Sequence, residues 1–293
     1  MGAGTGRSAD QHFQWPNGAR LAVSLVVNVE EGAELNIAEG DKVAEPVDEL
    51  GISFSRPVRN FGNESNYRYG IQEGAGRVLA LLSTYQMPAT FTAAAVALER
   101  APQLAQAIRA AGHEVCAHGL RWQMQHAMSE EEEREFIRGA VASIQRSVGE
   151  RPHGWLSRYM HSAHTRRLLV EEGFSYHMDD YSSDAPFWDG SCGRPIVVLP
   201  YALDSNDMKF WTAPALTPAQ WLQYAKDTCE WLYEEGAQQP RMMSLGVHLR
   251  IIGRPGRIGA YQQFLQYLSG QREVWVATRR EIAAHFATAV PYS

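Results

Sequence analysis

Strand-like and helix-like segments alternate along this chain, and this alternation constrains the fold more than any other feature. The first strand-like run, residues 20–29, is apolar at almost every position, which is typical of a strand buried on both faces. Similar runs predict strands at residues 20–29, 89–95, 113–118, 153–159, 176–181, 196–201, 242–249 and 274–280. Apolar residues at helical spacing predict helices between most of them, at residues 74–86, 101–112, 129–149, 164–173 and 217–236.

A buried strand followed by a helix, repeated seven or eight times, predicts a parallel sheet that curls into a barrel, regular or distorted. An open doubly wound sheet is the alternative, but no GxGxxG or Walker-type loop follows any predicted strand. The 293 residues contain no internal repeat, low-complexity tract or Gly/Ser linker. We therefore expect one α/β domain over residues 15–293, preceded by a flexible tail over residues 1–14.

Composition excludes several classes of partner. The formal net charge of −6 gives a nucleic acid little electrostatic support. No run of 18 apolar residues predicts a membrane span, and the first residues lack the apolar core of a signal peptide. Three widely spaced cysteines form no CxxC, which favours a reducing compartment. We expect a cytoplasmic protein that acts on a small molecule.

Polar residues gather where the predicted strands end. In both candidate architectures, active sites lie at the carboxyl ends of parallel strands. Six successive strand ends offer acids, bases, cations or amides, and such a coincidence favours an enzyme over a structural barrel. These residues are Glu30, Glu31, His118, Arg121, Trp122, Arg158, His177, Asp179, Asp180, Tyr201, Asp204, Asn206, Asp207, His248 and Arg250.

The pair Glu30 and Glu31 ends the first strand, with Gly32 directly after it. Adjacent strand residues point to opposite faces, so we expect only one of the two carboxylates to point into a site. A carboxylate in an apolar mouth has a raised pKa and can act as a general base. A simple loop entry is the alternative interpretation of an isolated Glu-Glu-Gly.

His118 raises the question of a metal, although a lone histidine is more often a packed residue than a ligand. A catalytic zinc needs about three protein ligands and one open position, and Glu31 and His118 offer two. The natural third position, one helical turn after His118, is Trp122, which cannot bind zinc. His126 and His177 are the remaining candidates. We expect no cofactor, with zinc as the less favoured alternative.

His248 ends an apolar strand behind Gly246, where a small residue would let a ligand approach the backbone. It is either a general acid or a packed histidine. Residues 253–257 (GRPGR) predict a turn. Residues 179–188, which include Asp184 and Trp188, offer an aromatic wall with polar groups that suits a small ring. Residues 60–70 predict a mobile loop that could act as a lid.

The strand-end residues resemble the motifs of the polysaccharide-deacetylase superfamily, carbohydrate esterase family four. Its first motif places two Asp at the end of the first strand, where this chain has Glu30 and Glu31. Its second motif is His-x-x-x-His, in which both histidines bind metal. His118 matches the first histidine, and Trp122 replaces the second. Further matches are the late catalytic histidine at His248 and an arginine motif at Arg158.

Longer phrases resemble a cytosolic branch of this superfamily that contains metal-independent allantoinases and cyclic imide hydrolases. They cover the chain from about residue 15 to its end and include WPNGARLAVSLVVNVEEGAE, AHGLRW, RPHGWLSRY, DDYSSDAPFW, PYALDSNDMKF and GVHLRIIGRPGR. The resemblance implies a distorted (β/α)7-type barrel, often assembled as a homotetramer.

The chain departs from the allantoinases of this branch on substrate-contacting loops. Where those members resemble GWYTGRTSPNT, this chain has GWLSRYMHSAHT, so the arginine shifts by one position and Ser-Pro-Asn gives way to residues 161–164. An acid is replaced by His177. These departures favour the bacterial cyclic imide hydrolases (imidases) of the Pseudomonas type.

The resemblance implies hydrolysis of a five- or six-membered cyclic imide, such as succinimide, maleimide or glutarimide, to a half-amide. Glu30 would be the general base and His248 the general acid. His118, with Glu31, would position the water, and Arg158 with backbone N–H groups would stabilise the oxyanion. Substrate contacts would come from Trp122, Asp179, Asp184, Trp188, Tyr201 and Asn206. The alternatives are an allantoinase-type ureide hydrolase, a zinc-dependent amidohydrolase, and a barrel that only binds a ligand.

Overall fold

The computed structural model describes residues 13–52, 54 and 56–292, so most of the expected N-terminal tail lies outside the described residues. One curled sheet of nine strands forms the centre, in the order β6-β7-β5-β4-β3-β2-β1-β8, with β9 pairing with the start of β1. Every pair is parallel except β6–β7. The strands are β1 (Leu21–Val29), β2 (Thr90–Ala93), β3 (Glu114–Ala117), β4 (Gly154–Trp155), β5 (Tyr176–His177), β6 (Phe187–Asp189), β7 (Ile196–Val198), β8 (Arg241–His248) and β9 (Val274–Val276).

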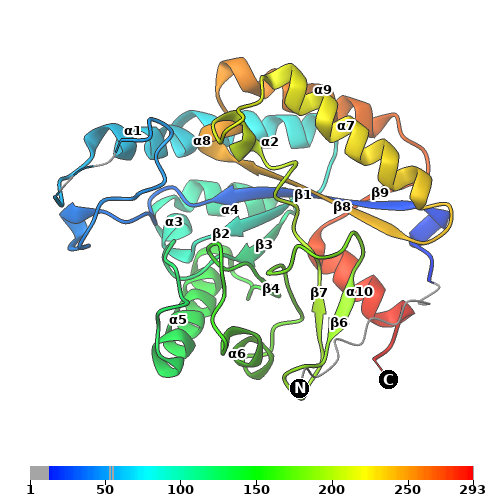
Figure 1. Cartoon of the computed structure of the whole chain (residues 1–293), viewed down its shortest axis with the longest axis horizontal. Coiled ribbons are helices and arrows are strands. Elements are labelled where there is room, and N and C mark those ends of the chain that lie inside the picture. The colour runs from blue at the N-terminus through cyan, green and yellow to red at the C-terminus, as the bar shows by residue number, and fades with distance from the viewer. Residues whose placement is uncertain (1–12, 53, 55, 293) are drawn as a thin grey trace.

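Helices cover the outside of this sheet (Figure 1), with α7 and α9 above β1 and β8 and with α5 and α6 below β2 to β4 in that view. The α-helices are α1 (Phe61–Tyr69), α2 (Ala75–Thr84), α3 (Ala95–Arg100), α4 (Pro102–Ala110), α5 (Glu130–Val148), α6 (Thr165–Glu171), α7 (Pro218–Glu235), α8 (Leu249–Ile252), α9 (Pro255–Ser269) and α10 (Arg279–Ala289). The distorted barrel expected from the sequence is therefore confirmed. Within the described part of the chain, no helix is both long and apolar enough to cross a bilayer.

All eight predicted strands and all five predicted helices occur. Helix α5 begins after Ser129, whose side chain forms a capping box with Glu132, and ends at Gly149 with φ 86°. Two predictions were wrong. Residues 60–70, predicted to be a loop, form α1 because Asn60 caps its first turn by accepting from the Asn63 backbone N–H. Residues 253–257, predicted to be a turn, form one only at residues 253 and 254, because Pro255 takes the first position of α9.

The alternation of side chains along β1 decides which glutamate faces the barrel interior. Leu21, Val23, Leu25, Val27 and Val29 pack outward against the helices in one core cluster. Ala22 and Val26 belong to the second cluster, on the inner side of the curl. Because side chains alternate with period two, Asn28 and Glu30 continue the inner row and Glu31 the outer row. On the neighbouring β8, His248 is in register with Asn28.

A π-helical turn, Gly70–Gly74, joins α1 to α2 and packs against α8, which directly follows β8. A Cβ at Gly70 would lie 2.4 Å from the Glu31 carboxylate, and one at Gly74 would lie 2.1 Å from the Leu249 carbonyl oxygen. The two glycines therefore let the helix approach the strand ends closely. π-Helical turns of this kind occur frequently at functional sites.

Replacing Gly70 with Ala should destabilise the protein, by about 1–3 kcal/mol, because the Glu31 carboxylate that the new methyl group meets is held by two backbone N–H groups and cannot swing away. Gly76→Ala, in α2, is the matched control, since a Cβ there meets nothing within 4 Å. It should be neutral or stabilising, by up to about 1 kcal/mol. Urea unfolding of both variants measures the difference, and equal free energies of unfolding would contradict this packing argument.

Candidate active site

A small pocket opens where β1, β3, β4 and β8 end, and its cavity volume is about 60 Å³. Polar groups from the strand ends lie at its base, and aromatic and aliphatic side chains form its walls. It is lined by Asn28, Glu30, His118, Trp122, Leu156, Ser157, Arg158, Tyr159, Tyr181, Tyr201, Leu203, Asn206, Met208 and His248. Seven of the eleven residues to which the sequence analysis gave a catalytic or substrate-contact role therefore meet in one place.

Glu30 is the carboxylate of this pocket. Its Oε1 lies 3.3 Å from Nε2 of His248 and 3.6 Å from Nε2 of His118, and its Oε2 accepts a 2.7 Å hydrogen bond from the Arg250 guanidinium. Burial alone would raise the pKa of Glu30, but Arg250 and His248 together hold it well below its usual value. The raised pKa expected for the pocket carboxylate was therefore wrong, because a cation from a distant part of the chain faces it.

His248 is held between two carboxylates. Its Nδ1 donates to Asp207 Oδ1 at 2.7 Å, and its backbone N–H donates to Asp207 Oδ2 at 2.8 Å. Burial alone would lower the pKa of His248, but Glu30 and Asp207 raise it to about 9. The imidazole is therefore protonated at neutral pH, and its Nε2 lies 3.3 Å from Glu30 Oε1.

His118 forms a wall of the pocket with both ring nitrogens already in use. Nδ1 donates to the Leu156 carbonyl oxygen at 2.7 Å, so Nδ1 carries a hydrogen. Nε2 accepts from the Trp122 indole N–H at 3.0 Å, so Nε2 carries none. The geometry does not favour the role in positioning water expected for His118, since no ring hydrogen faces the pocket.

Glu31 faces away from the pocket and ties two strand ends together. Its Oε2 accepts from the backbone N–H of Glu30 at 3.0 Å, and its Oε1 accepts from the backbone N–H of Arg250 at 3.0 Å. Burial raises the pKa of Glu31 above its usual value. Its position fits a residue that orients Glu30 relative to His248 rather than one that touches a substrate.

Arg158 lines the pocket, but its charge is already matched. Its guanidinium forms a buried ion pair with Glu45 at 2.6 and 3.1 Å, donates to the Trp122 carbonyl oxygen at 2.6 Å, and lies 3.8 Å from the centre of the Trp122 ring. Glu45 was not anticipated from the sequence, because it precedes Arg158 by 113 residues. This pairing does not favour the expected oxyanion role of Arg158.

The remaining substrate-contact candidates divide into two groups. Tyr201 and Asn206 line the pocket beside Trp122, and Asp179 lies just behind it, accepting from the Ser157 backbone N–H and hydroxyl at 2.7 Å each. Asp184 instead lines a neighbouring hollow. Trp188 packs against Phe286 and donates to the Val290 carbonyl oxygen near the end of the chain. Asp184 and Trp188 therefore lie outside the pocket.

Three further residues contact the reacting groups or line the pocket, although the sequence analysis assigned them no role. Asp207 and Arg250 were visible as polar strand-end residues, but nothing in the sequence paired them with His248 and Glu30. Asn28 could have been found, since it lies two positions before Glu30 and therefore on the same face of β1. It reaches the pocket beside Glu30.

The residues here do not fit a zinc site. The described residues contain no group of three His, Cys, Asp or Glu side chains arranged to hold a metal. The Nε2 lone pair of His118, the atom a metal would need, accepts from Trp122 instead. His177, proposed as an alternative ligand, is fully buried and accepts from the Asp179 backbone N–H, and His126 is exposed.

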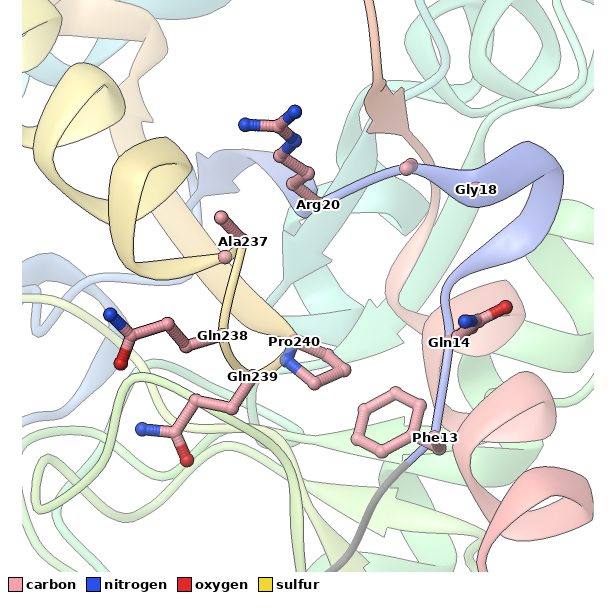
Figure 2. A pocket seen from close by; sticks show the side chains of 10 residues that line it. Phe13, Gln14, Gly18, Arg20, Ala237, Gln238, Gln239 and Pro240 are labelled. Atoms are coloured by element: carbon pink, nitrogen blue, oxygen red, sulfur yellow. The ribbon is translucent and has the colours of Figure 1, made fainter.

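A larger hollow, of about 660 Å³, lies at the other end of β1 and carries no hydrolytic chemistry (Figure 2). Figure 2 shows Phe13 and Pro240 pointing toward one another across it. Arg20 is its one charged lining residue in the described part of the chain, and the other lining residues include no acid or histidine. The small pocket is therefore the candidate active site despite its size.

A family model and a similar protein both place this chain in the same family. The polysaccharide deacetylase family model matches residues 66–175. A Schizosaccharomyces pombe protein whose name places it among the polysaccharide deacetylases is 34% identical over 300 residues, covering 95% of this chain and 93% of that protein.

Two solved structures resemble the chain over nearly its whole length. The crystal structure of Puue allantoinase is 40% identical with a TM-score of 0.90, and the match covers 95% of this chain and 94% of that one. A Pseudomonas aeruginosa PAO1 structure whose name also places it among the polysaccharide deacetylases is 40% identical with a TM-score of 0.90, covering 95% of each chain. This chain belongs to the polysaccharide deacetylase family and is a hydrolase of that superfamily.

Proposed function

We propose that this pocket hydrolyses five- or six-membered cyclic imides to half-amides without a metal ion. The observation that carries the proposal is the pairing of an ionised Glu30 with a protonated His248, 3.3 Å apart, at the base of a pocket of about 60 Å³. Such a pair supplies both a base for water and an acid for a leaving nitrogen. The aromatic and aliphatic walls of the pocket, with a few polar groups at its base, suit a small flat ring.

The positions of the two side chains support the following reaction. As the oxygen of water bonds to a ring carbonyl carbon, Glu30 Oε1 takes the proton that water loses. As the ring C–N bond breaks, the Nε2–H of His248 protonates the departing nitrogen. Glu30 then returns its proton to His248 Nε2 across 3.3 Å, and the new carboxylic acid releases its own proton to solvent.

The chemistry of an imide suits a site whose proposed reacting groups are one acid and one base. An imide nitrogen leaves more easily than a simple amide nitrogen, because the second carbonyl delocalises its negative charge. The tetrahedral intermediate therefore collapses with less assistance. In this pocket the Trp122 indole N–H donates to the lone pair of His118 Nε2. The reaction would then need only the acid and the base.

Allantoin hydrolysis is the second candidate, because a structure that is 40% identical over 95% of this chain is named an allantoinase. The same acid–base pair would also open a ureide ring. The departures at residues 158–164, which begin at the pocket residue Arg158, favour imides over allantoin.

Turnover of succinimide, maleimide, glutarimide and allantoin by exhaustively chelated protein tests the proposal. We expect hydrolysis of one or more imides, unchanged by added zinc, because Trp122 blocks the only histidine of the expected metal motif. Metal content is measured on the same samples. Turnover of allantoin alone would assign the second function, and activity that appears only with zinc would contradict the metal-free mechanism.

Glu30→Gln should lower kcat about 10²- to 10⁴-fold, because the amide cannot take a proton from water. Glu131→Gln, on the exposed surface of α5, is the matched control and should retain full activity. Circular dichroism establishes that both variants are folded. A folded Glu30→Gln variant with normal turnover would remove Glu30 from the mechanism.

The rate should fall as the pH rises through about 9, because His248 then loses the proton that the leaving nitrogen needs. Below that pH His248 stays protonated, and the low pKa of Glu30 keeps the base ionised through the neutral range. Asp207→Asn removes a carboxylate that raises the pKa of His248, so the alkaline limb of kcat/KM should move to lower pH. An identical limb in both proteins would mean that it reports ionisation of the substrate.

A further inference from the structure

We infer that the hydroxyl group of Tyr201 donates the hydrogen bond that stabilises the oxyanion at the reacting carbonyl. This inference rests on the proposed function and assigns to one side chain a role that Arg158 and backbone groups were expected to fill. The hydrogen-bond donors and acceptors around the Tyr201 hydroxyl support this role.

Asn28 donates to Tyr201, and the orientation of its amide is fixed by its other partners. Its Nδ2 lies 3.1 Å from the Val247 carbonyl oxygen, which can only accept, so this atom must be the NH₂ group. Its Oδ1 accepts from the Thr92 hydroxyl at 2.7 Å. The second Nδ2 hydrogen is thereby directed to the Tyr201 oxygen, 3.1 Å away.

Asn206 also donates to Tyr201, for an equally firm reason. Its Oδ1 caps the short 3₁₀-helix Asp207–Phe210 by accepting from the Met208 backbone N–H at 2.8 Å. A backbone N–H can only donate, so the atom that faces Tyr201 must be Nδ2. It lies 2.9 Å from the Tyr201 oxygen.

Two donors therefore occupy both lone pairs of the Tyr201 oxygen, and its own hydrogen needs a different acceptor. A hydroxyl carries two lone pairs and one donatable hydrogen. Among the described residues, the only hydrogen-bond partners of this hydroxyl are the two asparagine donors. Tyr201 lines both the pocket and the neighbouring hollow, but the two asparagines that donate to its hydroxyl line the pocket and not the hollow. The hydroxyl therefore lies on the pocket side, where an acceptor can reach it.

The backbone leaves room for this arrangement at one glycine. A Cβ at Gly246, on β8, would lie 2.0 Å from the Tyr201 hydroxyl oxygen and 2.9 Å from Nδ2 of Asn206. From the sequence we expected Gly246 to let a ligand approach the backbone. In the structure the space beside Gly246 is taken by the Tyr201 hydroxyl. The glycine lets the Tyr201 hydroxyl reach the row of inner residues next to His248.

Arg158 and His118 are less suited to this role. Both terminal nitrogens of the Arg158 guanidinium are bound by Glu45, and its Nε–H, which has no partner among the described residues, is buried. Neither ring nitrogen of His118 has a hydrogen free for the pocket. Burial raises the pKa of Tyr201 above its ordinary value, so the hydroxyl keeps its hydrogen throughout the working pH range. The two N–H groups that donate to its oxygen polarise the O–H bond and strengthen it as a donor.

The step balances without any further reactant. When the oxygen of water bonds to the carbonyl carbon, the C=O electron pair moves onto the carbonyl oxygen, which accepts a hydrogen bond from Tyr201. When the C–N bond breaks, the pair returns and nitrogen takes its hydrogen from His248. Tyr201 retains its hydrogen throughout, so it acts only by hydrogen bonding.

Tyr201→Phe should lower kcat about 10²- to 10³-fold, the usual effect of removing one oxyanion donor, while KM changes by about threefold or less. Tyr176→Phe is the matched control. Tyr176 is another fully buried tyrosine, whose hydroxyl donates to Glu114 at 2.8 Å at the start of β3, and its variant should keep normal kcat. A folded Tyr201→Phe variant with kcat within threefold of the wild type would overturn the inference.

A second variant decides the matter if Tyr201→Phe fails to fold. Asn206→Asp keeps the phenol ring but turns the donor facing Tyr201 into an acceptor, which draws the hydroxyl hydrogen away from the pocket. A fall in kcat of tenfold or more supports the inference, and unchanged kcat overturns it. Both variants are assayed on a substrate that the wild type turns over, so failure of the wild type on every imide and ureide would instead refute the proposed function.

Discussion

Glu30 and Arg250 form an ion pair inside the molecule, 2.7 Å apart and 220 residues apart in the chain, and the geometry of the pocket depends on it. Two adjacent carboxylates at the end of a fully buried strand would be costly without compensation. The Arg250 guanidinium supplies it, lying 3.6 Å from Glu31 and 4.2 Å from the centre of the Tyr67 ring. Trp122 stands where the superfamily motif has a metal-binding histidine, and the positive charge comes from an arginine instead.

This cation also sets the protonation states on which the proposed chemistry relies. Arg250 and His248 keep Glu30 ionised, while Glu30 and Asp207 keep His248 protonated. Each charge in the row stabilises its neighbour, so base and acid coexist at neutral pH within 3.3 Å. The backbone contacts of Glu31 to Glu30 and Arg250 hold the members of this row in place.

The sequence predicted the barrel well because its signals are local. The apolar runs, the capping box at Ser129 and the stop at Gly149 each act within one segment, and strand ends of parallel sheets gather by geometry. The alternation of side chains along β1 also predicts that only one of the two glutamates faces the pocket. Deciding which one requires knowing which face of β1 lies inside the barrel.

What could not be predicted depends on contacts between distant segments. The low pKa of Glu30 requires Arg250, the matched charge of Arg158 requires Glu45, and the free hydrogen of Tyr201 requires the orientations of Asn28 and Asn206. Trp188 looked like a wall of the pocket because its neighbours are acidic and aromatic, but β6 directs it toward the end of the chain. None of these pairings leaves a local pattern.

The proposed chemistry depends most on an ionised carboxylate and a protonated imidazole that face one another in this pocket. Nitrogen NMR of the protein labelled in histidine, with His248 assigned by substitution, measures this state directly. We expect both ring nitrogens of His248 to carry a hydrogen at neutral pH, and one of these hydrogens to be lost only near pH 9. A neutral His248 at pH 7 would contradict this expectation, because the pocket would then hold no proton for the leaving nitrogen.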